Sequence, residues 1–203
     1  MRRERIGFTL IEVLLVSMLL SVVALAVFKA FSDGVALWKR VNVESRDEDL
    51  NIFFSDVTAR LTSAFVHASV RFEGGRDRIA FPAIVPFEFE DGVRGTVGRV
   101  MYFYDGADDS ICVEQADYSR VYEGRRGTIR SLLKGAVSLR FSYYCRDPEE
   151  KKFLWVREWR KDELPANVDA EKTLPVAVKI TVEFREGNEY KEYTRTVALP
   201  VGG

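Results

Sequence analysis

The chain has 203 residues, of which 47% are hydrophobic and 30% are charged, which is enough for one ordinary core and at most two domains. Its 30 basic and 31 acidic residues give a formal net charge of −1, without the basic stripe that neutralises phosphates, so nucleic acid is not an expected partner. An aromatic content of 12% and the absence of long polar or repetitive tracts argue against disorder.

The first 28 residues contain a basic start followed by an apolar stretch. Three arginines precede residue 8, and the positive-inside rule places such a start on the cytoplasmic face of a membrane. Between residues 8 and 28 the only charged side chain is that of Glu12. As a helix, this stretch is long enough to cross the hydrocarbon core of a bilayer, which is about 30 Å thick.

Three interpretations of this stretch compete. A secretory signal peptide, cut at the small residues Ala24 and Ala26, would release a soluble periplasmic binding module. An ordinary single-pass anchor would carry Glu12 only by accident, although a carboxylate costs about 2.5 to 3.5 kcal/mol at the bilayer centre. In the third, favoured interpretation the chain is cut between Gly7 and Phe8, and the new α-amine of Phe8 pairs with Glu12 of a neighbouring subunit.

The start of the apolar stretch also resembles a known processing signal. The run that carries the resemblance is Gly7-Phe8-Thr9-Leu10-Ile11-Glu12-Val13-Leu14-Leu15-Val16. It is similar to the type III signal of type IV pilins and type II secretion pseudopilins. The resemblance implies that a prepilin peptidase cleaves after Gly7 and methylates Phe8, and that Glu12 acts in recruitment and alignment during filament assembly. It also implies a single-pass inner-membrane protein with a cytoplasmic N-terminus and a periplasmic head.

The helical pattern continues beyond the apolar stretch. No proline occurs before Pro82, and apolar residues recur at three- and four-residue steps. These positions are Val35, Trp38, Val41, Leu50, Phe53, Phe54, Val57, Leu61, Ala64 and Phe65. The pattern predicts a helix from Thr9 to about His67, either continuous or divided into two at a weak point near Gly34.

Short alternating runs separated by turn signals follow residue 67. The expected strands are residues 78–82, 100–104, 111–115, 138–144, 153–159, 177–184 and 192–199, with a hairpin between the last two. We therefore expect an α+β, pilin-like fold, in which a long N-terminal helix packs on an antiparallel β-sheet head. The expected divisions are a cytoplasmic leader (1–7), a transmembrane half-helix (8–31), a periplasmic amphipathic half-helix (32–67) and a β-rich periplasmic head (68–203).

The order of segments in the head resembles a particular pseudopilin family. Across residues 98–184, the runs that begin at Gly98, Leu132, Trp155 and Leu174 follow one another as in the minor pseudopilin J of type II secretion. This resemblance implies a structural subunit at the filament tip that binds pseudopilins I and K and the major pseudopilin, and that contacts secreted proteins. A minor pilin of a type IV pilus or competence system is the alternative.

The sequence offers little to an enzyme, and we expect neither catalytic residues nor a cofactor. His67, the sole histidine, lies near the predicted helix end, where it can cap carbonyls or simply be exposed. Asp105, Asp108 and Asp109 crowd one turn, either as calcium ligands or, more simply, as a solvated turn. Trp155 and Trp159 are predicted to share one side of a strand or helix, as core or as a partner-binding patch.

Cys112 and Cys145 lie in the part of the chain that is expected outside the cytoplasm, where disulfides persist. They form either a disulfide or two buried thiols that pack as small hydrophobic side chains. Two cysteines and one distant histidine are too few for a thiolate metal site, so no metal is expected.

Overall fold

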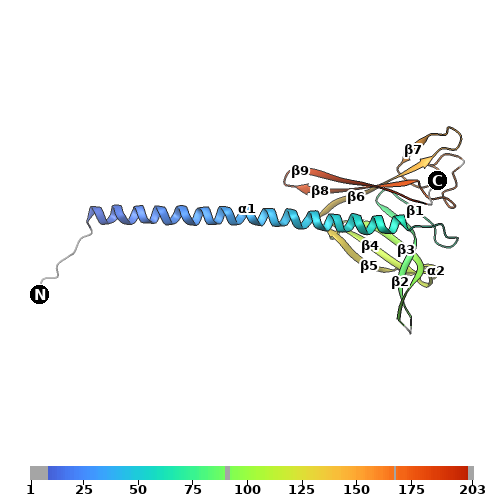
Figure 1. Cartoon of the computed structure of the whole chain (residues 1–203), viewed down its shortest axis with the longest axis horizontal. Helices are drawn as coiled ribbons and strands as arrows, with labels where there is room; N and C mark the ends of the chain where they lie inside the picture. The colour runs from blue at the N-terminus through green and yellow to red at the C-terminus, as the bar shows by residue number, and fades with distance from the viewer. Residues whose placement is uncertain (1–8, 90–91, 167, 201–203) are drawn as a thin grey trace. The chain divides into compact units, whose positions relative to one another are not determined.

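The computed structural model describes residues 9–89, 92–166 and 168–200, and the chain divides into two compact units, Met1–Glu48 and Asp49–Gly203. The two units are described separately below. The fold is α+β: a long, apolar N-terminal helix is followed by antiparallel sheets (Figure 1).

The first unit consists of the N-terminal part of helix α1, which spans Leu10–Thr62. The helix passes through Gly34 without a break, so of the two predicted alternatives the structure shows the continuous helix. A glycine inside a helix costs about 1 kcal/mol relative to alanine, and the strong helix formers on both sides outweigh this cost.

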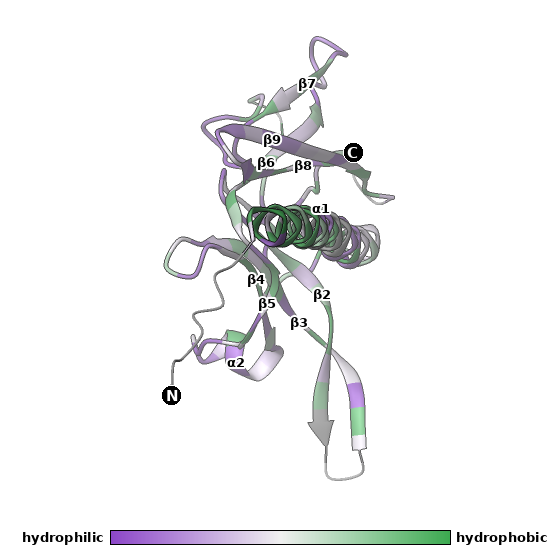
Figure 2. Cartoon of the chain, turned by 90° about the vertical axis from the view of Figure 1, so that its left-hand side faces the viewer, coloured by the Kyte–Doolittle hydropathy of each residue, from purple (hydrophilic) through white to green (hydrophobic). Residues whose placement is uncertain are grey.

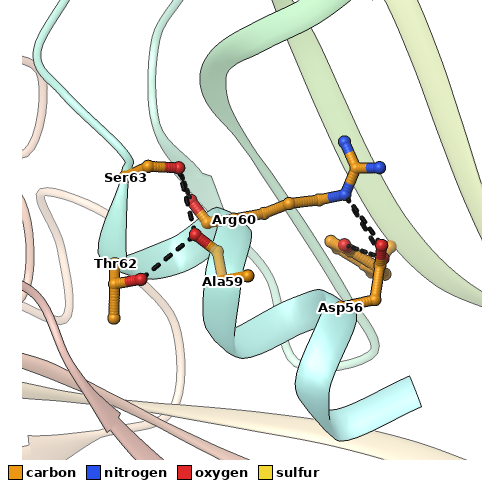
Figure 3. A network of polar contacts seen from close by, with 6 residues as sticks. Asp56, Ala59, Arg60, Thr62 and Ser63 are labelled. Atoms are coloured by element: carbon orange, nitrogen blue, oxygen red, sulfur yellow. Dashed lines mark hydrogen bonds and ion pairs between the residues drawn. The ribbon is translucent and has the colours of Figure 1, made fainter. Parts of the chain in front are cut away.

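Helix α1 ends at Thr62, earlier than the predicted end near His67. Two hydroxyl groups donate hydrogen bonds to backbone carbonyls at this end of the helix (Figure 3). Thr62 Oγ1 donates to Thr58 and Ala59. Ser63 Oγ donates to Ala59 and Arg60. The bonds to Ala59 and Arg60 satisfy carbonyl groups that would otherwise lack intrahelical partners at the helix end.

The second unit contains two antiparallel sheets. The five-stranded sheet has the order β1-β2-β3-β4-β5, with β1 Glu73–Gly74, β2 Arg78–Phe89, β3 Gly92–Asp105, β4 Ser110–Asp117 and β5 Thr128–Lys134. The four-stranded sheet has the order β7-β6-β8-β9, with β6 Ala136–Arg146, β7 Phe153–Val156, β8 Ala177–Glu186 and β9 Glu189–Ala198. A short helix, α2 (Tyr118–Tyr122), connects β4 to β5.

The C-terminal turns of α1 lie between the two sheets and share one core with them (Figure 2). Phe53 packs edge-on against Tyr102 of β3, while the Arg195 guanidinium of β9 lies 5.1 Å from the centre of the Phe54 ring. The predicted apolar face is confirmed over this part of the helix, because Leu50, Phe53, Phe54, Val57, Leu61 and Ala64 are buried. Further toward the N-terminus, Val35 and Trp38 of the same predicted face are exposed.

The predicted strands are all present, with changed bounds. Sequence patterns did not indicate β1, β5 or α2. They also underestimated the lengths of β2 and β3, which pair with each other continuously as far as Phe89 and Gly92. The predicted final hairpin is confirmed: β8 pairs with β9 from Ala177↔Ala198 to Glu186↔Glu189, and Gly187 in its turn has φ 64°. That positive φ is the reason for a glycine at this turn.

Candidate functional site

The N-terminus of helix α1 is closed by a reciprocal pair of hydrogen bonds between Thr9 and Glu12. The Glu12 carboxylate accepts from the Thr9 backbone N–H and from the Thr9 hydroxyl, each at 2.9 Å, and the Glu12 N–H donates to Thr9 Oγ1 at 3.4 Å. This is a capping box, in which threonine and glutamate three residues apart satisfy the free donors at a helix start. The Thr-x-x-Glu spacing could have revealed this role for Thr9 from the sequence.

Behind this cap, helix α1 exposes an apolar surface on all sides. Every large apolar side chain between Leu10 and Phe31 is 55% to 87% exposed, and the part of the helix nearest the viewer in Figure 2 is mostly green, that is, hydrophobic. The segment Leu10–Trp38 has 29 residues, and its most apolar 18-residue stretch has a mean hydropathy of 2.7. At about 1.5 Å per residue it is long enough to cross a bilayer, so it fits a single-pass membrane anchor.

Ser17 and Ser21 are compatible with such an apolar setting. Ser17 donates to the carbonyl of Val13, and Ser21 donates to the carbonyl of Ser17 at 2.8 Å. Hydroxyl groups that bond back to their own helix present no unsatisfied donor to lipid.

In the second unit, a polar contact joins the end of α1 to the five-stranded sheet. The fully buried Tyr102 donates its hydroxyl to Asp56 Oδ2 at 2.6 Å. Arg60 Nε donates to the same carboxylate at 3.2 and 3.3 Å (Figure 3). Burial raises the pKa of Tyr102 far above its usual value, and the hydrogen bond to Asp56 raises it further. The side chains of Asp56 and Arg60 are both partly buried, with 22% and 23% of their surface exposed.

The candidates for chemistry in the head lie apart from one another. His67 lies beyond the helix end, where its Nδ1 accepts from the Ser69 N–H at 3.2 Å and its ring packs edge-on against Phe65 and Tyr118, so the expected carbonyl cap is wrong. Within residues 9–89, 92–166 and 168–200, no group of three His, Cys, Asp or Glu side chains is arranged to hold a metal ion.

The turn with three aspartates is held by its own hydrogen bonds. Asp105 accepts from the Ala107 N–H at 3.0 Å, and Asp109 accepts from the Tyr104 hydroxyl at 2.8 Å. This hydrogen bond to Asp109 raises the pKa of Tyr104. Two of the three carboxylates, those of Asp105 and Asp109, therefore accept hydrogen bonds within the turn.

Trp155 and Trp159 do not share one side of an element, which corrects the prediction. Strand β7 ends at Val156, and Trp155 remains 40% exposed beneath the Lys179 ammonium, which lies 4.3 Å from its ring centre. Trp159 lies beyond the end of the strand and is buried. Its backbone N–H donates to the Gly74 carbonyl at 2.7 Å, and its indole N–H donates to the Ala170 carbonyl at 3.3 Å.

The two cysteines are free, buried thiols in different sheets, so the disulfide alternative is not formed in this structure. Cys112 lies in β4 with its sulfur 3.4 Å from the Ser110 hydroxyl, and Cys145 lies in β6 with its sulfur 3.8 Å from the Leu154 carbonyl. Burial raises the pKa of the Cys145 thiol, and the Asp147 carboxylate raises it further.

Comparison with known families adds one match. Residues 2–28 match the model described as the prokaryotic N-terminal methylation motif, which is the signature of type IV pilins and pseudopilins. No curated protein sequence matches the chain. The motif implies processing by a prepilin peptidase and assembly with other pilin-like subunits, and it supports a type IV pilin-like protein. Gly7 and Phe8, the predicted cleavage and methylation residues, lie outside the described residues.

Proposed function

We propose that this chain is a minor pseudopilin of a type II secretion system, a structural subunit at the pseudopilus tip that helps to initiate filament assembly and protein export. It is not an enzyme on this proposal. It is cut after Gly7, methylated on Phe8 and held in the inner membrane by α1, with its head in the periplasm.

The observation that carries the proposal is the Thr9–Glu12 capping box at the start of an exposed apolar helix. A carboxylate at the membrane-inserted end of a helix is costly when alone, and an opposite charge on a neighbouring subunit offsets part of that cost. The α-amine of a processed Phe8 provides that charge. The pairing then favours one register between subunits, because it forms only when the two helix starts are adjacent.

The finer assignment rests on the order of segments in the head. The runs that resemble pseudopilin J fall in β3, in the β5–β6 region, in and after β7, and at the start of β8. A minor pilin of a type IV pilus or competence system would share the anchor and the motif, and it would differ in the subunits that its head binds.

The first experiment tests how the N-terminus is processed. The chain is expressed with a prepilin peptidase, and the N-terminal mass of the membrane-bound product is determined. We expect a chain that begins at methylated Phe8. A soluble product that begins near Val27 would show a secretory signal peptide and overturn the proposal.

Two matched variants then distinguish the charge of Glu12 from its capping role. Glu12→Gln keeps the hydrogen bonds of the capping box but removes the charge, whereas Thr9→Val removes the hydroxyl but keeps the charge. If the charge aligns subunits, Glu12→Gln abolishes incorporation into filaments, while Thr9→Val is incorporated. Equal incorporation of both variants would contradict the alignment role.

Copurification tests the particular assignment. The full chain is extracted from membranes that contain the pseudopilins of a type II secretion system, and we expect it to retain pseudopilins I and K. Retention only by the subunits of a type IV pilus would replace the proposed function by the alternative.

A further inference from the structure

We draw no further inference here: the strongest candidate, the outer edge of strand β3 at Val93 and Gly95, beyond its last pair with β4, carries no proposal because nothing among the described residues shows what covers it.

Discussion

The Tyr102 hydroxyl donates a 2.6 Å hydrogen bond to Asp56, which fastens strand β3 to the last turns of helix α1. Tyr102 is fully buried, so this hydroxyl has no access to water in the folded head. Arg60 holds the Asp56 carboxylate from the next turn of the helix, at 3.2 and 3.3 Å. The contact fixes the rotation of the helix relative to the sheet, because only one face of α1 presents Asp56 to Tyr102.

Removal of the acceptor should destabilise the head strongly. Asp56→Ala leaves the Tyr102 hydroxyl buried without a partner, and we expect a loss of about 2 kcal/mol in the free energy of unfolding. Asp56→Asn keeps an acceptor and should lose less. Chemical unfolding in detergent, followed by tryptophan fluorescence, measures the difference. Ser55→Ala, on the exposed side of the same turn, is the control. An equal loss of unfolding free energy in both alanine variants would show that Asp56 has no special role.

Alkaline pH should weaken the head through Tyr102. Burial and Asp56 raise the pKa of Tyr102 above the ordinary value of 10.0 that applies to the unfolded chain. The unfolded chain therefore loses this proton first, and the stabilisation that is present below pH 10 is lost as the pH rises above it. The expected slope is about 1.4 kcal/mol per pH unit for this group. Tyr102→Phe should reduce the slope by that amount. An unchanged slope would show that Tyr102 ionises equally in both states.

The sequence predicted the helix better than the sheet because the two depend on different information. The buried positions Phe53, Val57 and Leu61 follow from a local period of 3.6 residues. The long β2–β3 ribbon was missed because Pro82, Pro86 and Gly95 are ordinarily strand breakers. They are tolerated here because the prolines face an outer edge, and because Gly95 leaves room for Ile84 on the facing strand.

The contacts of the candidate site also differ in how far they could be predicted from the sequence. The Thr9–Glu12 capping box lies within four consecutive residues, so the sequence contains all that is needed to infer it. The contact between Asp56 and Tyr102 joins residues 46 positions apart, and no local pattern indicates it. Trp159 was misplaced because the alternation of β7 stops at Val156, after which the chain turns to join its backbone to Gly74.

Gly74 should not tolerate a side chain. A Cβ atom at this position would lie 2.6 Å from Trp159 Cβ and 2.6 Å from Tyr143 Cζ, where the two sheets meet. We expect Gly74→Ala to reduce the free energy of unfolding by about 1 to 3 kcal/mol, because the buried Trp159 and Tyr143 must move. Gly106→Ala is the matched control, since its nearest neighbour, Tyr104 Cε1, lies at an ordinary 3.6 Å. Equal stability of the two variants would show that the junction is loosely packed.

The cysteines should behave as free, poorly reactive thiols. Cys112 and Cys145 are buried in different sheets, and burial raises the pKa of Cys145, which keeps it protonated and unreactive at neutral pH. We expect iodoacetamide to modify neither thiol in the folded chain and both after unfolding, without prior reduction. Mass spectrometry of the protein, purified without reductant, measures the number of modified thiols. If unfolded protein reacts only after reduction, the two cysteines form a disulfide in the cell, and the strands that carry them lie closer together than in this structure.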